Sequence, residues 1–523
     1  MSRIPPQSSP QPIDVDALCD AVRAAYPHGP DAVVAIVRAA FTALSDRITA
    51  LEADVAQLHR RLGADSTNSS KPPSTDISRA RRHIESLRVR SGMRPGGQPG
   101  HEGSGLAWHT VPDAIVDHVP LMCAECGCPL PEVPSGAHIS NARTLDRAQV
   151  YDLPPVVLTV TEHRRMAVTC ERCGLESAAQ FPHDIVSGVQ YGSEVKSLAV
   201  ALHGYHLLPY GRTAEFLDAV LGDGPSTGSV VRWVREAAVK LEGTSEATAR
   251  SITAQHAAHA DETSLHVNGK RYWLHVASTG THTHYHVHEK RGFIGIDAGG
   301  VWGKFRGVMV HDGWWPYGRY REARHQLCLA HLRREALGLF TFTKDLGHPE
   351  RWLTDIEKLL GRLHRLVGRA AVAGRPALAR RTIAKLSTQY DAITRRARRR
   401  HPYPKQGRDN VRAGRPNRGA VAAFADRLIK YREDVLRCAR DARIPADNNQ
   451  AERDIRMAKL ADKISGGFRT MDGARQFCTI RSALSTARKQ GRTAIAVLRD
   501  AFSTSISIPS LIGQLQQAAA PAC

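Results

Sequence analysis

Three carboxylates in the sequence have the chemistry to hold divalent cations against a phosphate group. Asp261 lies in the segment HADET, Asp312 follows the apolar run VMVH, and Glu452 lies in DNNQAERDIRMAK, residues 447 to 459. Two neighbouring aspartates stay ionised together only when cations lie between them, and a third carboxylate completes a site for two Mg²⁺ or Mn²⁺ ions about 3.5 to 4 Å apart. Such a site would activate a water or a 3′-hydroxyl for in-line displacement at phosphorus.

A simpler interpretation of Glu452 is a surface ion pair on a capped amphipathic helix. Asp447 is a good N-cap, Ala451 and Ile455 lie at helical spacing, and Glu452 could pair with Arg456 one turn later. The choice between a metal ligand and a surface ion pair depends on where the two aspartates lie.

The segments around the two aspartates have the alternation typical of β-strands. Three successive strands are predicted near 256 to 262, 271 to 278 and 282 to 288, with Asp261 at the end of the first. A short helical piece follows, and then a buried strand that ends at Asp312. This order of elements is that of the ribonuclease H fold, in which carboxylates at the ends of the first and fourth strands lie side by side.

Four cysteines form two CxxC pairs that predict structural Zn²⁺, because four thiolates complete a closed tetrahedral shell. The pairs are Cys123 with Cys126 and Cys170 with Cys173, joined by β-type sequence that reads as a zinc ribbon. Cys128 offers a competing thiol. The arrangement suits a metal in a reducing compartment better than a disulfide framework.

Positive charge indicates nucleic acid as the leading partner. The chain of 523 residues has 72 Lys and Arg against 51 Asp and Glu, a net charge of +21 and a pI near 9.9. Residues 190 to 245 predict three helices with Ser226 or Thr227 capping the last, compatible with helix-turn-helix DNA binding or with a domain that only packs. The residues predicted to contact DNA are Arg232, Arg235, Arg453, Arg456, Lys459 and Arg469.

Four further patterns leave alternatives open. An a/d seam on a helix predicts self-association or packing within the chain, and it consists of Leu44, Ile48, Leu51, Val55, Leu58 and Leu62. Alternating histidines favour an exposed polar strand face over a metal ladder, and they are His282, His284, His286 and His288. Cys328 and His331 favour packing over a second zinc site. The arginines between 395 and 400 either track a phosphate backbone or form a solvated face.

Along nearly its whole length, the chain resembles the insertion-sequence-sixty-six family of bacterial DDE transposases in several long sequence segments. They include NSSKPPSTD, GGQPGHEG, HADET, HDGW, HQLCLAHLRRE and DNNQAERDIRMAKLADKISGGFRT. The resemblance implies DNA cleavage and strand transfer with Asp261, Asp312 and Glu452 at the DDE positions, and a helical insertion between the last two. It also implies double-stranded DNA as partner, a homodimer or higher synaptic complex, small accessory proteins, and a cytoplasmic, nucleoid-associated location without a membrane span.

The predicted architecture is a multidomain α+β protein. Its parts are an N-terminal helical region with a short coiled coil (1–63), a Pro/Gly/Ser-rich linker (64–110), a zinc ribbon (111–185), a helical DNA-binding-like domain (186–250), a ribonuclease H-like catalytic core (251–335 and 441–490) with a helical insertion (336–440), and a C-terminal segment (491–523). The alternative functions are a zinc-dependent DNA-binding protein without catalysis, repressor-like or an inactive transposase, and a related nuclease that needs no strand transfer.

Overall fold

The structure is a computed structural model in which α-helices accompany two β-sheets, and the predicted α+β class is confirmed. It describes residues 15–63, 106–130, 144–153, 156–182, 184–186, 188–403 and 419–503. The chain divides into two compact units, one formed by Met1–Arg82 with Arg235–Cys523 and the other by His83–Val234. No helix among the described residues is long and apolar enough to cross a membrane.

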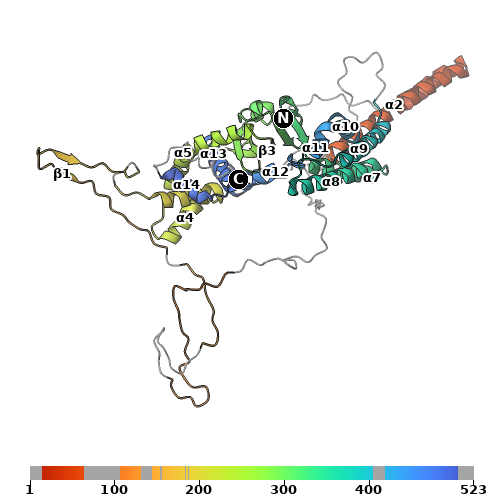
Figure 1. Cartoon of the computed structure of the whole chain (residues 1–523). Helices are drawn as coiled ribbons and strands as arrows, with labels where there is room; N and C mark the ends of the chain where they lie inside the picture. Colours follow the sequence, from red (N-terminus) through yellow and green to blue (C-terminus); the bar gives the residue numbers. More distant parts are fainter. Residues whose placement is uncertain are drawn as a thin grey trace. The chain divides into compact units, whose positions relative to one another are not determined.

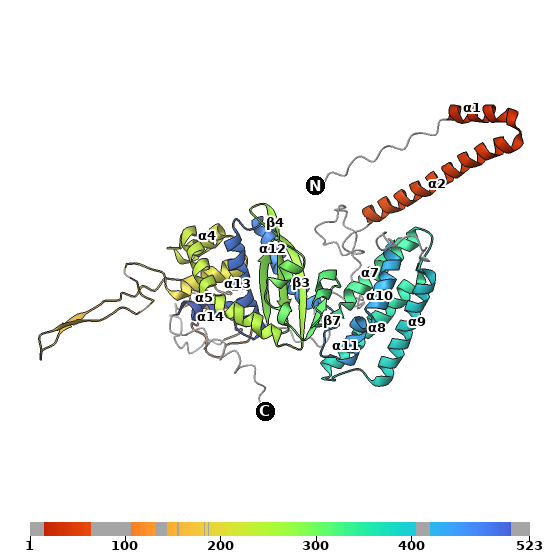
Figure 2. The same ribbon diagram turned by 90° about the horizontal axis from the view of Figure 1, so that it is seen from above.

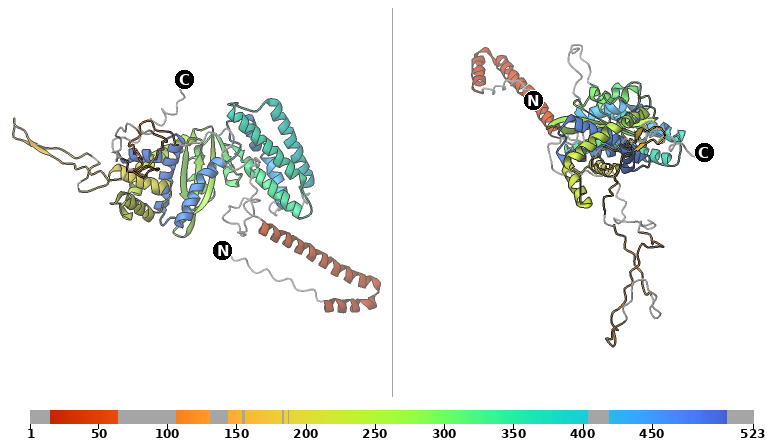
Figure 3. Two further views of the ribbon diagram at one scale, coloured as in Figure 1. Left: turned by 90° about the horizontal axis from the view of Figure 1, so that it is seen from below. Right: turned by 90° about the vertical axis from the view of Figure 1, so that its left-hand side faces the viewer.

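Near the N-terminus, helices α1 (Val15–Ala25) and α2 (Pro30–Gly63) form a helical hairpin (Figure 3). The predicted heptad helix is confirmed as part of α2. Its seam continues toward the helix start, because exposed apolar side chains recur there at steps of three and four. They are Val34, Val37, Phe41, Leu44 and Ile48. The side chains of the later seam positions lie outside the described residues.

The unit His83–Val234 contains the CxxC pairs and the beginning of a helical region. Strands β1 (Ala167–Thr169) and β2 (Glu176–Ala178) form a short antiparallel hairpin with exposed residues (Figure 1). Helices α3 (Ser193–Val200), α4 (Tyr210–Leu221) and α5 (Thr227–Thr253) confirm the three predicted helices. The hydroxyl of Ser226 accepts a hydrogen bond from the Ser229 N–H at 3.2 Å, as a cap does. Helix α5 is longer than predicted and continues into the other unit.

A five-stranded mixed sheet forms the centre of the unit that contains Arg235–Cys523, with the strand order β5-β4-β3-β6-β7 (Figure 2). The strands are β3 (Ala257–Val267), β4 (Lys270–Ser278), β5 (Thr283–His288), β6 (Val308–His311) and β7 (Arg324–Leu327). Strands β3, β4 and β5 pair antiparallel, whereas β6 pairs parallel with β3 and β7 parallel with β6. The three predicted antiparallel strands and the buried fourth strand are therefore confirmed.

One strand boundary differs from the prediction in a way that concerns the site. Strand β3 continues to Val267, so Asp261 lies within the strand and the prediction that it ends there is wrong. The extra residues pair with β4, where Asp261 lies opposite Val276. The parallel pairing of β3 with β6, in contrast, stops at His259. Asp261 thus lies beyond the end of that pairing, where the edge of β3 toward β6 is open.

Helices cover both faces of this sheet. Helix α12 (Asn449–Ser465) contacts β3 and β4, and α13 (Met471–Lys489) contacts β5, while α14 (Ala494–Phe502) packs on α13. On the other face the short helix α6 (Phe293–Asp297) joins an apolar cluster that includes Ala258, Ala260, Trp302 and Phe305. A left-handed glycine, Gly466, ends α12, and the chain then rejoins β3 through Phe468, whose N–H donates to the His266 carbonyl at 2.8 Å.

Between β7 and α12 the chain forms a separate bundle of helices (Figure 2). The helices are α7 (Leu329–Asp345), α8 (Arg351–Val372), α9 (Arg380–Arg400), α10 (Gly419–Lys430) and α11 (Arg432–Arg440). Apolar residues on α8 recur at helical spacing, and Trp352, Ile356, Leu360 and Leu363 are buried in the bundle core. The predicted helical periodicity from 351 to 400 is confirmed as two helices, α8 and α9.

The alternating histidines of β5 do not form the predicted exposed polar face. His284 and His286 are largely buried. The ring of His286 stacks with that of His275 from β4, with centroids 4.9 Å apart, and with that of His284 at 6.3 Å. Helix α6 and the turn after it pack over the rings, since a Cβ added at Gly295 would lie 2.9 Å from Nε2 of His275 and one added at Gly299 would lie 2.4 Å from the His286 ring. Nε2 of His286 donates to the Gly295 carbonyl at 2.6 Å. Burial lowers the pKa of His284 and of His286 to about 4.

A pH-dependent loss of stability follows from these neutral rings. The pKa of His286 rises from about 4 in the folded chain to 6.5 on unfolding, so protons favour the unfolded state as the pH falls from 6.5 toward 4. We expect His286→Gln, which keeps an N–H for Gly295, to lose about 2 kcal/mol less unfolding free energy than the wild type between pH 7 and pH 5. Urea denaturation at the two pH values measures this. The exposed His348→Gln is the control, and an unchanged pH dependence in His286→Gln would contradict the prediction.

Candidate functional site

The register of the sheet makes Asp261 and Asp312 lateral neighbours. Ala257 pairs with Val308 and His259 with Val310, and the same register continued for two residues sets Asp261 beside Asp312. Asp312 directly follows β6, and its carboxylate accepts the N–H of Trp314 at 2.8 Å. The two carboxylates therefore come together where β3 and β6 separate.

Three carboxylates gather at this point, those of Asp261, Glu262 and Asp312. Burial, together with Glu262 and Asp312, raises the pKa of Asp261 well above its usual range, although Lys459 acts in the opposite direction. Burial and Asp312 also raise the pKa of Glu262 to about 7. Carboxylates crowded in this way favour either a proton or a divalent cation between them.

Glu262 is a carboxylate that the sequence analysis missed, and it is held by an arginine between two aromatic rings. Nε and Nη2 of Arg291 donate to its Oε1 at 3.0 and 2.8 Å, and the Tyr317 hydroxyl donates to its other oxygen. The guanidinium lies 4.9 Å from the Trp273 ring centroid and 4.1 Å from that of Trp314. The Glu262 side chain is only 3% exposed, so the pair is desolvated.

Removing the cation from this pair should cost more stability than removing an exposed one. We expect Arg291→Met to lower the free energy of unfolding by about 3 to 5 kcal/mol, because it leaves the buried Glu262 carboxylate without a cation. Lys290→Met, which removes a surface ion pair with Glu289, should cost below about 1 kcal/mol. Thermal denaturation of Arg291→Met and Lys290→Met measures the two losses of stability. The double variant Glu262→Gln/Arg291→Met should recover part of the loss, and its failure to do so would exclude the buried charge as the cause.

One buried asparagine fixes the start of α12 against the sheet. Asn448 is fully buried, its side-chain N–H donates to the Ala260 carbonyl at 2.8 Å, and its side-chain oxygen lies 3.0 Å from Nδ1 of His259. Its backbone N–H donates to the Cys328 Sγ at 3.1 Å. Asn448 thereby joins β3, the start of α7 and the start of α12, and sets the height of the α12 first turn above the sheet.

Two charged neighbours complete the anchoring of α12. The carboxylate of Asp447 lies 2.7 Å from Nε2 of His364 on α8, and it also accepts the Asn449 N–H at 3.0 Å. One turn into the helix, Asp454 forms a buried ion pair with Lys489 at 2.7 Å. The N-cap position is occupied by Asn448, so the predicted cap at Asp447 is displaced by one residue.

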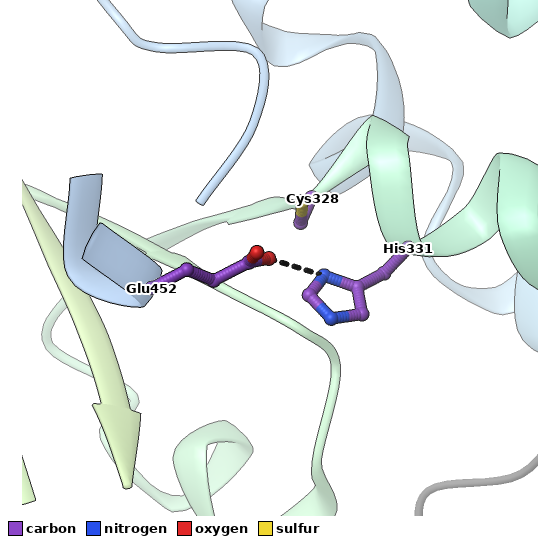
Figure 4. Close-up of side chains that lie close together, drawn as sticks. All are labelled: Cys328, His331 and Glu452. Carbon is purple, nitrogen blue, oxygen red and sulfur yellow. Dashed lines mark ion pairs between the residues drawn. The ribbon is translucent and has the colours of Figure 1, made fainter. Parts of the chain in front are cut away.

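These anchors present Glu452 on the first turn of α12. Its carboxylate lies 3.6 Å from Nδ1 of His331 (Figure 4) and 3.3 Å from Arg334, both on α7. Among the described residues, the predicted pair with Arg456 does not form. The long-range contact with α7 is stronger than the local helical one because α12 and α7 meet at Asn448. Glu452 is therefore part of a tertiary cluster.

Cys328, His331 and Glu452 form a set of donors that suits a transition metal. Their ligand atoms lie within 4.8 Å of one another, the one such group of three among the described residues (Figure 4). Burial raises the pKa of the Cys328 thiol to about 12. Burial and Arg334 lower the pKa of His331, which favours the neutral imidazole that a metal needs. Thiolate, imidazole and carboxylate together favour Zn²⁺ over Mg²⁺, which prefers oxygen ligands.

The structure brings two of the three predicted catalytic carboxylates beside each other, with the third nearby. Asp312 and Glu452 both act on the ionisation of His331, and Asp261 acts on Tyr317 together with Asp312. The three carboxylates do not meet within 4.8 Å, because Glu452 turns toward α7. Their roles as metal ligands stay predictions.

Each CxxC pair lies in a tight turn with a backbone that fits a metal. The Gly127 N–H donates to the Cys123 carbonyl at 3.0 Å, and the Gly174 N–H donates to the Cys170 carbonyl at 2.8 Å. Both glycines have a φ near +70°, a conformation that side chains disfavour. Backbone N–H groups of Cys126 and Glu125 lower the pKa of the Cys123 thiol.

The second pair repeats the first. Backbone N–H groups of Cys173 and Arg172 lower the pKa of the Cys170 thiol, which favours the thiolate that a metal needs. Among the described residues, no three of the four sulfurs come within 4.8 Å of one another. The structure thus shows two similar turns that it does not gather into one site, and the zinc ribbon stays a prediction.

The cations predicted to bind DNA lie on two helices and one turn. Arg232 and Arg235 are on α5, and Arg469 follows α12. The remaining three are on the first turns of α12: Arg453, Arg456 and Lys459. Arg453 donates to Gln450 at 2.7 Å, and the other five form no ion pair within the described residues. Lys459 acts on the ionisation of Asp261, so it lies close to the carboxylates.

Sequence reasoning missed the residues that act through buried contacts. Asn448 and Glu262 each hold a group on a distant element, and Asp447, expected only as a helix cap, also contacts His364 of α8. Local sequence patterns indicate only contacts within one element. The sequence segments HADET and DNNQAE contain the partners in the Asn448 contact: His259 and Ala260 lie in the first and Asn448 in the second.

Comparison with known families defines the class of protein. A family described as Transposase IS66 family matches residues 188–476, a stretch that contains all three carboxylates. The chain belongs to the IS66 family of transposases, because the match covers more than half of its 523 residues. Membership implies DNA binding and the use of divalent metal ions. A family of unknown function matches residues 4–107. No curated protein matches the chain.

Proposed function

We propose that this transposase cleaves DNA at transposon ends and transfers the strands to target DNA at a ribonuclease H-like site. The observation that carries the proposal is the register of β3 and β6, which makes Asp261 and Asp312 neighbours beneath the first turn of α12. The strand order β5-β4-β3-β6-β7, with three antiparallel strands followed by two parallel ones, supports the fold assignment.

The raised pKa of Asp261 supports divalent cations at this site. Asp261, Asp312 and Glu452 would hold two Mg²⁺ or Mn²⁺ ions, and Glu452 would exchange its contact with Arg334 for the cations. When bound, Mg²⁺ supplies Lewis-acid activation of the attacking oxygen and stabilises the leaving one. Cys328 and His331 position Glu452, since Cys328 fixes Asn448 and His331 faces the carboxylate.

The surrounding cations would orient the DNA. Phosphates beside the carboxylates would be neutralised by α12 and the turn that follows it, through Arg453, Arg456, Lys459 and Arg469. The helical region with Arg232 and Arg235, and a zinc ribbon formed by the two CxxC turns, would add contacts to the transposon ends. Two ends must meet in one complex, and the exposed apolar seam of α2 supports a homodimer. The reaction would take place at the nucleoid in the cytoplasm, with small accessory proteins joining the complex.

A strand-transfer assay tests the proposal with the purified chain, Mg²⁺ and DNA that carries the ends flanking its gene. Joined products support the transposase. Cleavage that yields only hydrolysed ends favours the nuclease alternative, and binding without cleavage, even with neighbouring small proteins added, favours the DNA-binding alternative. Either of the last two results would overturn the proposed reaction.

A further inference from the structure

Helices α8 and α9 enclose a groove with a strongly basic lining. Its volume is about 710 Å³. The charged residues that line it are Asp355, Lys358, Arg362, Arg395, Arg396 and Arg399. One acid therefore faces five cations, and a partner of opposite charge is needed to relieve their mutual repulsion.

Packing of the bundle determines which side chains face the groove. On α8, Lys358 and Arg362 lie one turn apart, while the intervening Leu359 and Leu360 are buried in the core. On α9, the buried Ile393 takes the corresponding inward position. Because the apolar residues take the inward face, the cations of both helices point outward along the same groove.

The arginine run of α9 divides into two groups. Arg398 forms an ion pair with Asp426 at 2.6 Å. Arg400 forms one with Glu350 at 2.8 Å. These two arginines stabilise the bundle, so the run is neither wholly a phosphate track nor wholly a solvated face.

The remaining cations face the groove, and Arg395 among them donates to the Asp391 carbonyl at 3.2 Å. Arg396 pairs with Asp355 at 2.6 Å. Lys358, Arg362 and Arg399 are exposed and form no ion pair within the described residues. Unpaired cations held on two helices are a feature of surfaces that bind a polyanion.

Helix α8 also leads to the candidate active site. His364, half a turn beyond Arg362, contacts Asp447 at 2.7 Å, directly before α12. Glu357, one residue before Lys358, pairs with Arg333 of α7 at 2.6 Å. One face of α8 therefore supports the elements that carry Glu452, and another lines the basic groove.

We propose that the α8–α9 groove binds the phosphate backbone of duplex DNA and holds it on the same helix that supports the catalytic elements. This inference rests on the proposed function. The groove offers five cations on two helices, more than a single phosphate needs, and this favours a ligand that carries several phosphates, such as duplex DNA. The contacts are to the backbone, so the groove binds without reading the sequence.

The test replaces the three unpaired cations in the full-length chain, as Lys358→Ala/Arg362→Ala/Arg399→Ala. Binding is measured by fluorescence anisotropy over a range of salt concentrations, with a duplex carrying the transposon end and an unrelated duplex of equal length. We expect affinity for both duplexes to fall about 10- to 100-fold at moderate salt. The slope of log K against log salt should become shallower by about two to three.

A matched control carries the same change of charge elsewhere, as Lys304→Ala/Arg321→Ala/Arg324→Ala. These side chains are exposed and form no ion pair within the described residues. The control should keep the wild-type slope to within about one unit. A loss of affinity for both duplexes supports binding of the phosphate backbone in the groove, whereas a loss for the end duplex alone would contradict binding that does not read the sequence.

Two results separate this inference from the proposed function. In the first, the wild type joins transposon ends, and the groove variant shows the same slope of log K against log salt as the control variant. The groove inference is then wrong and the proposed function stands. If the wild type binds DNA but neither cuts nor joins it, while the groove variant still loses slope, the proposed reaction fails and the groove stands. Thermal denaturation of the groove variant, expected within about 2 °C of the wild type, excludes unfolding as the cause.

Discussion

Glu452→Gln should abolish end cleavage and strand transfer, by at least about 10³-fold, while affinity for the end duplex changes less than about threefold. The amide keeps the shape of the side chain and its contact with α7 but loses the charge that a divalent cation needs. The measurement is a strand-transfer assay in Mg²⁺ beside a binding assay on the same preparation. Asp261→Asn and Asp312→Asn should give the same pattern, because all three carboxylates would hold the same ions.

Glu289→Gln is the matched control for charge. Glu289 is exposed and pairs only with its neighbour Lys290, at 3.5 Å, among the described residues. It should keep wild-type activity. If Glu452→Gln keeps more than about a tenth of the wild-type rate, Glu452 is a structural partner of Arg334 and not a metal ligand.

Loss of the CxxC cysteines should remove tightly bound zinc. We expect the wild-type chain to carry about one Zn²⁺ and Cys126→Ser/Cys173→Ser to carry none, because two thiolates alone do not complete a tetrahedral shell. Without zinc, a protease should cut the chain readily between residues 111 and 185, because strands β1 and β2 of this region are short and exposed. Elemental analysis and limited proteolysis measure the two effects.

Cys328→Ser and Cys128→Ser distinguish the possible ligands. Both variants should keep the zinc, because Cys328 lies in the cluster around Glu452 and Cys128 follows the first turn. Zinc that persists in Cys126→Ser/Cys173→Ser and disappears in Cys328→Ser would show that the cluster of Cys328, His331 and Glu452 is the zinc site. That result would contradict the predicted zinc ribbon.

Local patterns were enough to predict the elements of the candidate site. Alternation marked β3, β4 and β5, an apolar run marked β6, and helical spacing marked α12, because each depends on residues close in sequence. The partner of Glu452 was not predictable in the same way. Its contact with Arg334 spans 118 residues, and the helical spacing suggested only Arg456. The predicted exposure of the β5 histidines was wrong for a similar reason, because α6 and the turn after it pack over the rings at Gly295 and Gly299.

The basic run of α9 shows the same limit. Its composition favoured neither a phosphate track nor a solvated face, because the side-chain directions depend on where Asp426 and Glu350 lie. Composition gives the charge of a segment, and only the packed bundle determines which charges remain free.

The junction at Asn448 has a consequence for the order in which activity appears during synthesis. Its contact with His259 joins residues 189 positions apart, so a ribosome must complete most of the chain before β3 receives this partner. A nascent or truncated chain that ends before residue 448 has its two aspartates but lacks both Asn448 and Glu452. If Asp261, Asp312 and Glu452 form the proposed site, cleavage can begin only after the whole region from β3 to α12 has been made and folded.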